Sequence, residues 1–148
     1  MGDEKPDLTL LYEQNASVLA IFLEWRHKVM TYWFAIVGAV FAAAAWLYQQ
    51  PAGRSWLALP LALGALFSAL SALLDRRNVQ ILQGCYRVGG ELEIELFGRS
   101  GIYQFIGDTH EGRITYTQVL RICYWGVATL LGLLSGLSAA FIRSPAAG

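Results

Sequence analysis

Three long stretches of the chain are mostly apolar and contain no charged residue. Crossing the hydrocarbon layer of a membrane takes about 20 apolar residues in a helix, and each stretch is long enough. Helices of a soluble bundle would carry charged residues on a solvent face, and these stretches carry none, so we favour a membrane protein although 55% hydrophobic residues alone would also allow a soluble bundle. We predict an all-α membrane protein with three transmembrane helices, at 29–48, 56–74 and 122–142.

The stretch before the first span is also expected to be helical. Pro6 and Asp7 are typical of a helix start, because the Asp carboxylate can accept hydrogen bonds from the first N–H groups, and no Gly or Pro follows before Gly38. One helix from about residue 8 to about residue 49 would be roughly 60 Å long, at about 1.5 Å per residue. Half of it would project into the cytoplasm as an amphipathic helix over residues 1–28.

Apolar residues in this first stretch recur at alternating steps of three and four, the spacing of a heptad seam along which helices pack side by side. A polar residue in such a seam lowers stability but selects the register and the number of partners, and we predict that role for Asn15. An amphipathic helix on the membrane surface is the alternative. Such helices usually carry Lys and Arg, whereas residues 8–25 contain two Glu and no base, so we favour a packed stalk. The predicted oligomer seam comprises Leu11, Asn15, Val18, Phe22 and Trp25.

The second span offers this stalk an antiparallel partner. The three-four spacing of apolar residues continues beyond Leu74, and a tight outer turn at 49–55 contains Pro51 and Gly53. Residues 91–96 alternate Glu with Leu or Ile, which allows an edge strand, but Glu and Leu are strong helix formers. We therefore expect a helix that breaks at Gly98, followed by a Gly-rich loop, within a cytoplasmic region at 75–121.

Charge is distributed on one side of the predicted spans. All eleven acidic residues and nine of the eleven basic residues lie before the first span or between the second and third. Cytoplasmic segments carry the excess of Lys and Arg, so we predict a cytoplasmic N-terminus and a periplasmic tail at 143–148. Because no secretory or transit leader precedes the first span, the expected location is the bacterial inner membrane. Basic residues expected at its inner face are Arg26, Lys28, Arg76, Arg77 and Arg121.

The third span contains a stripe of small residues that would let another helix approach closely. Small stripes also serve packing inside one subunit, but a short chain with three spans encloses little alone, and homo-oligomers are the usual solution. No span has an ionisable residue at its centre, which disfavours a transporter; hydroxyl residues such as Ser68, Ser71, Thr129, Ser135 and Ser138 could line a pore. The residues predicted for helix packing are Ala128, Gly132, Gly136 and Ala140.

No pattern in the chain is typical of an enzyme. Cys85 and Cys123 lack metal-site spacing and are expected to remain thiols, and His110 with its acidic neighbours is more typical of a solvated turn. We therefore expect no catalytic residues, cofactor, metal site or nucleic-acid partner. Arg99 and Arg113 leave open a weaker hypothesis, a sensor for an anionic small molecule in the loop.

Residues 8–97 resemble small bacterial membrane proteins of the RipA-like and SLATT type. The resemblance is carried by the acidic helix leading to Trp25-Arg26-His27-Lys28, by a second span closing on Leu74-Asp75-Arg76-Arg77-Asn78, and by the segment with Glu91-Leu92-Glu93. It implies a helical hairpin that extends into the cytoplasm, a ring that is octameric in the RipA-like group, and, for SLATT proteins, service as pore-forming effectors in antiphage defence. The third span lies outside this resemblance.

Two functions are thus expected from different classes. The first is a homo-oligomeric inner-membrane protein that forms a gated pore or a membrane-disrupting assembly, controlled through its cytoplasmic helices. The alternative is a non-catalytic membrane anchor or regulatory scaffold that recruits a cytoplasmic partner. The expected partners are the lipid bilayer, further copies of the chain, and a cytoplasmic regulatory protein or signal.

Overall fold

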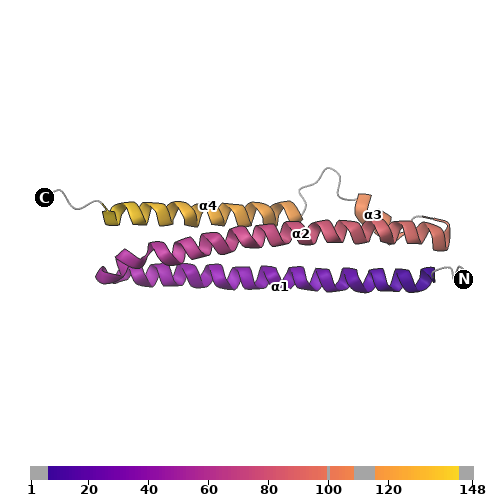
Figure 1. Ribbon diagram of the computed structural model, residues 1–148, viewed down its shortest axis with the longest axis horizontal. Coiled ribbons are helices and arrows are strands. Elements are labelled where there is room, and N and C mark those ends of the chain that lie inside the picture. The colour runs from indigo at the N-terminus through magenta and orange to yellow at the C-terminus, as the bar shows by residue number, and fades with distance from the viewer. Residues whose placement is uncertain (1–6, 100, 109–115, 144–148) are drawn as a thin grey trace, which may run out of the picture. The chain divides into compact units, whose positions relative to one another are not determined.

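The computed structural model describes residues 7–99, 101–108 and 116–143, with the side chains of 107, 108 and 141–143 left out. Every regular element in this part of the chain is a helix (Figure 1), which confirms the predicted all-α fold. Three helical stretches are long and apolar enough to cross a membrane, by length and composition. The elements are α1 (Leu8–Gln49), the 3-10 turn η1 (Pro51–Trp56), α2 (Ala58–Phe97), α3 (Ile102–Asp108) and α4 (Tyr116–Arg143).

Helix α1 begins at the predicted residue. The Asp7 carboxylate accepts hydrogen bonds from the N–H groups of Thr9, at 3.0 Å, and Leu10, at 3.4 Å, so Asp7 caps two donors that lack a partner in the helix. The helix then runs without a break to Gln49, which confirms one long helix. Pro51 opens η1 at a position where its missing N–H costs nothing.

Helix α2 includes the segment for which a strand was the alternative. Leu92 and Glu93 are adjacent and both buried, which a helix allows but a strand does not when only one of its faces is covered. Gly98 ends the helix with a φ of +68°, and its N–H donates to the carbonyl of Ile94 at 2.9 Å. Glycine adopts this left-handed conformation without strain, so the predicted break at Gly98 is confirmed.

Helix α3 lies within the segment after Gly98 for which the sequence predicts a Gly-rich loop. It forms there because α2 supplies a cap for its first N–H groups. The loop residues His110, Glu111 and Arg113, and the tail after Arg143, lie outside the described residues. Helix α4 begins at Tyr116, six residues before the predicted third span.

The chain divides into two compact units, which are described separately. Unit 1 contains Met1–His27 and Arg76–Thr115, and unit 2 contains Lys28–Asp75 and Tyr116–Gly148. Residues 8–27 of α1 belong to unit 1 and the remainder belongs to unit 2. These divisions fall close to the positions where the charge pattern places the inner ends of the spans.

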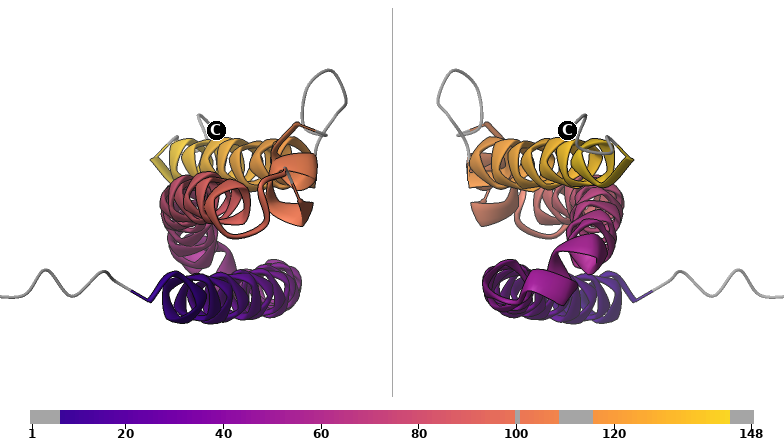
Figure 2. Two further views of the ribbon diagram at one scale, coloured as in Figure 1. Left: turned by 90° about the vertical axis from the view of Figure 1, so that its right-hand side faces the viewer. Right: turned by 90° about the vertical axis from the view of Figure 1, so that its left-hand side faces the viewer.

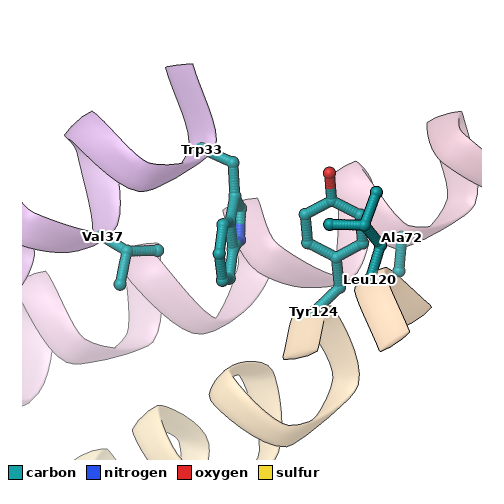
Figure 3. Close-up of a cluster of buried hydrophobic side chains, with 5 residues drawn as sticks. All are labelled: Trp33, Val37, Ala72, Leu120 and Tyr124. Atoms are coloured by element: carbon teal, nitrogen blue, oxygen red, sulfur yellow. The ribbon is translucent and has the colours of Figure 1, made fainter. Parts of the chain in front are cut away.

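In unit 2, α1, α2 and α4 run side by side, with α2 flanked by the other two (Figures 1 and 2). The indole of Trp33 meets the ring of Tyr124 edge-on, with ring centroids 4.8 Å apart, and both side chains are buried (Figure 3). The Trp33 Nε1–H donates to the hydroxyl of Ser68 at 2.8 Å. The remaining members of this cluster are Val37, Ala72 and Leu120.

Close packing in unit 2 depends on Gly64. A Cβ atom there would lie 2.9 Å from both Leu131 Cδ1 and Val40 Cγ1, closer than real side chains come. A small residue at this point therefore lets the three helices approach one another, as is common between membrane helices.

Candidate functional site

The interior of unit 1 contains a buried carboxylate among buried apolar side chains such as Leu82 and Leu92. Glu93 of α2 is 3% exposed. Its Oε1 accepts a hydrogen bond from the N–H of Ile102 at 2.9 Å, and its Oε2 accepts one from the N–H of Tyr103 at 3.1 Å. The first N–H groups of a helix have no partner within it. Glu93 therefore caps α3 from a different helix, which explains why a helix forms in the predicted loop.

Two glycines make this contact sterically possible. A Cβ atom on Gly101 would lie 2.5 Å from Glu93 Oε1, and one on Gly89 would lie 2.6 Å from the ring of Tyr103. The carboxylate therefore approaches the start of α3 over Gly101, and the Tyr103 ring packs directly on the backbone of α2 at Gly89. Glycine inside a helix weakens it by about 0.5–1 kcal/mol relative to alanine, and here it provides the seat for α3.

Helix α1 joins the same cluster through Tyr12. The Tyr12 hydroxyl donates to Glu93 Oε1 at 3.4 Å, and its ring meets those of Tyr103 and Phe97 edge-on, at centroid distances of 5.6 Å and 6.2 Å. Burial, with the nearby Glu93 carboxylate adding to it, raises the pKa of Tyr12 above its usual value of 10.0. Burial likewise raises the pKa of Tyr103. Both phenols therefore keep their protons at neutral pH and can act as donors.

Asn15 has its hydrogen-bond partners inside the chain. Its Nδ2 donates to the carbonyl of Cys85 on α2 at 3.0 Å, and its side chain also bonds to Tyr103. Asn78 mirrors this arrangement, since its Nδ2 donates to the carbonyl of Phe22 on α1 at 3.3 Å. The sequence predicts that Asn15 sets the register between subunits. In the structure its amide forms hydrogen bonds within the subunit.

The other predicted seam residues separate into two faces of α1. Asn15 and Phe22 are half-buried within the subunit, together with Tyr12 and Leu19. The alternate seam positions are left exposed: Leu11 at 38%, Val18 at 41% and Trp25 at 55%. Ile21, at 60%, continues this face, and Gln14 occupies its polar position. We call Leu11, Gln14, Val18, Ile21 and Trp25 the outer stripe; it follows the same three-four spacing as the packed face.

The small-residue stripe of α4 is only partly used inside the subunit. Ala128 is half-buried, and a Cβ atom on Gly132 would just reach Ala65, at 4.0 Å. Gly136 and Ala140 are exposed, and a Cβ atom on Gly136 would meet no described atom within 4 Å. Of the four predicted packing residues, Ala128 and Gly132 thus lie toward the other helices of the subunit, and Gly136 and Ala140 do not. Of the basic residues expected at the inner face, Arg26 is half-buried. The others are exposed: Lys28, Arg76, Arg77 and Arg121.

Sequence reasoning did not identify Glu93 as a central residue. It treated Glu93 as one of three similar carboxylates in an alternating segment. The available signal was the mostly apolar segment Ile102–Ile106 between two glycines, which is too short to be stable as a helix without a docking surface. Within the described ranges, no group of three or more His, Cys, Asp or Glu side chains is placed to hold a metal ion.

Comparison with protein-family models, with curated proteins and with solved structures finds no match to this chain. The resemblance of residues 8–97 to RipA-like and SLATT proteins therefore stays a prediction.

Proposed function

We propose that the chain is the subunit of a homo-oligomeric protein of the bacterial inner membrane that assembles through α1 and opens or disrupts the membrane when assembled. The observation that carries this proposal is the outer stripe. Its four apolar side chains are exposed at helix-packing spacing, in the part of α1 that precedes the predicted span. Contiguous exposed apolar residues mark interaction sites, and this spacing fits a second helix lying alongside.

Unit 2 offers a second face of the same kind. Ala35, Ala39 and Ala43 of α1 are exposed, as are Gly136 and Ala140 of α4. Small side chains on the outside of membrane helices allow another backbone to approach closely. These residues are not needed for packing within the subunit, which makes them available for packing between subunits.

The proposed path runs between subunits rather than through one subunit. Ser68 and Ser71 are buried, and their hydroxyls bond to Trp33 and to the carbonyl of Phe67. Ser135 likewise bonds to the carbonyl of Ala58. The hydroxyls of Ser68 and Ser135 join neighbouring helices and that of Ser71 bonds within α2, so all three have partners inside the subunit. The exposed Thr129 and the exposed small faces are therefore better candidates for a pore lining.

The test uses the full-length chain in phospholipid vesicles that contain a trapped dye. Ile21→Glu places a charge on the outer stripe, and Leu23→Glu places the same charge on another exposed face of α1. We expect the unmodified chain and Leu23→Glu to form oligomers by native mass spectrometry and to release dye, and Ile21→Glu to remain monomeric and silent. A chain that releases no dye in any oligomeric state contradicts the proposal.

A scaffold that recruits a cytoplasmic protein is the second candidate. It is favoured by exposed apolar side chains outside the outer stripe, where α2 ends and α3 begins: Ile94, Phe97, Ile102 and Phe105. The two candidates respond differently to substitution. Under the scaffold hypothesis Ile102→Asp abolishes partner binding, whereas Ile21→Glu leaves partner binding intact. Neither substitution changes the release of dye from vesicles.

A further inference from the structure

We propose that α3 is a detachable strap whose docking on α1 and α2 holds the subunit in an unassembled state. This inference rests on the proposed function and names its regulation. The start of the strap is held from α2 and α1: two of its N–H groups bond to Glu93, and the Tyr103 ring packs on Gly89 and meets the ring of Tyr12 edge-on. Ile102, Gln104 and Phe105 are exposed.

A seven-residue helix has almost no stability of its own in water. Helix α3 therefore forms only while it is docked, and loss of the Glu93 cap both releases and unfolds it. The hydrogen bonds that hold it can be exchanged for hydrogen bonds to water, so their net contribution is much smaller than their strength in isolation. The strap therefore depends on its docking surface in a way that the long helices α1 and α2 do not.

The strap covers a surface that continues the outer stripe. Tyr103 and Gln104 lie over Gly89 and Gly90 of α2, and Tyr103 bonds to Asn15 of α1. Asn15 and Tyr12 each neighbour Leu11 on α1, at the edge of the outer stripe. Release exposes these two side chains and a glycine notch, which widens the stripe into a seat for the α1 helix of a second copy.

In this state Asn15 becomes available to a second copy. Its bond to the carbonyl of Cys85 joins α1 to α2 and remains, while the part of the amide that bonds to Tyr103 in the docked state can then bond across the interface, as a polar residue in a heptad seam does. The role of Asn15 between subunits, predicted from the sequence, thus belongs to the state in which α3 is released. Its bond to Tyr103 belongs to the state in which α3 is docked.

The first test locks the strap covalently. A Cβ atom on Gly90 would lie 3.9 Å from the Cβ of Gln104, within the span of a disulfide. Gly90→Cys with Gln104→Cys is made in a chain where Cys85 and Cys123 are replaced by Ala, with Gly90→Cys alone as the control. In vesicles we expect the oxidised double variant to stay monomeric and to release dye only after reduction. In the control, oxidation should change neither the oligomeric state nor the release of dye.

The second test releases the strap. In Gly89→Ala the new methyl group meets the Tyr103 ring, whereas in Gly84→Ala it meets no described atom within 4 Å, so the pair shares the gain in helix propensity and differs in the clash. We expect amide exchange in α3 to accelerate at least about tenfold in Gly89→Ala, with more oligomer and faster dye release, and no change in Gly84→Ala.

The two proposals fail in distinguishable ways. Equal assembly of the oxidised and reduced double variant overturns the strap and leaves the assembly proposal standing. Faster exchange of α3 in Gly89→Ala with no oligomer and no dye release in any variant overturns the proposed function, and the strap's regulatory role with it.

Discussion

Unit 2 contains the apolar cluster around Trp33 and Tyr124, in which Trp33 donates a hydrogen bond to Ser68. Unit 1 contains Glu93 and Asn15, whose side chains bond to neighbouring helices. Among lipids, apolar contact between helices gives little gain over contact with lipid, so close fit decides packing. In water, polar bonds compete with solvent and are individually weak. The difference teaches that unit 2 is built to hold one arrangement, while unit 1 is built of contacts that can be exchanged.

The largest expected effect is on the apolar cluster of unit 2. Trp33→Ala removes a buried ring from between Val37 and Tyr124 and leaves the Ser68 hydroxyl without its donor. We expect the free energy of unfolding to fall by about 3–5 kcal/mol, measured by titration with denaturing detergent in mixed micelles and followed by circular dichroism. Trp46→Ala, at an exposed tryptophan of the same helix, should leave it nearly unchanged. Equal losses in both variants would show that the cluster is not the centre of unit 2.

A smaller effect tests whether close fit decides packing in unit 2. Gly64→Ala places a methyl group against Leu131 and Val40, whereas Gly38→Ala places one where no described atom lies within 4 Å. We expect Gly64→Ala to destabilise the chain by about 1–3 kcal/mol through overpacking and Gly38→Ala to be neutral or slightly stabilising. The same detergent titration measures both, and a neutral Gly64→Ala would break the contrast between the units.

A third substitution tests the exchangeable contacts of unit 1. Asn15→Leu removes the bonds to Cys85 and Tyr103, and we expect it to weaken docking of α3 by about 0.5–1.5 kcal/mol, measured as faster amide exchange in α3. Ser17→Leu likewise replaces a polar residue of α1 by leucine, at an exposed position outside the outer stripe, and should leave this exchange unaltered. If Asn15→Leu alters the oligomer number but not the exchange of α3, Asn15 acts only between subunits.

The smallest effect is expected from pH. Because burial raises the pKa of Tyr12 and Tyr103 above 10.0, the folded state favours the protonated phenols. Their contribution to stability is therefore complete below pH 10.0 and is lost as pH rises through the raised values. The free energy of unfolding, followed by circular dichroism, should fall in that range as the phenolate absorbance rises. In Tyr12→Phe with Tyr103→Phe this fall should disappear; its persistence would place the pH response elsewhere.

Much of the fold was predictable because its determinants are local. Asp7 caps residues two and three positions ahead, and Gly98 ends α2 through its own backbone conformation. The apolar stretches predict membrane-length helices by composition alone. Such features require no knowledge of what lies across the chain, so a single sequence is enough to place them.

The candidate site could not be assembled in the same way. Tyr12 and Glu93 are 81 positions apart, and Asn15 and Cys85 are 70 apart, so spacing along the chain contains no sign of their contact. The heptad spacing of α1 was correctly identified, but two faces of the helix share it. Only the packed structure separates Tyr12, Asn15 and Leu19 on the inside from the outer stripe.

The sequence by itself determined that this chain is helical, where its longest helices begin and end, and which stretches are apolar enough for a membrane, since helix propensity, capping and hydropathy act over a few neighbouring residues. The tertiary structure decided that α3 exists, that Glu93 holds it, and which face of α1 stays exposed. These depend on which atoms meet across different helices, and a carboxylate or an apolar stripe acquires its role only from the surface that it touches or leaves bare.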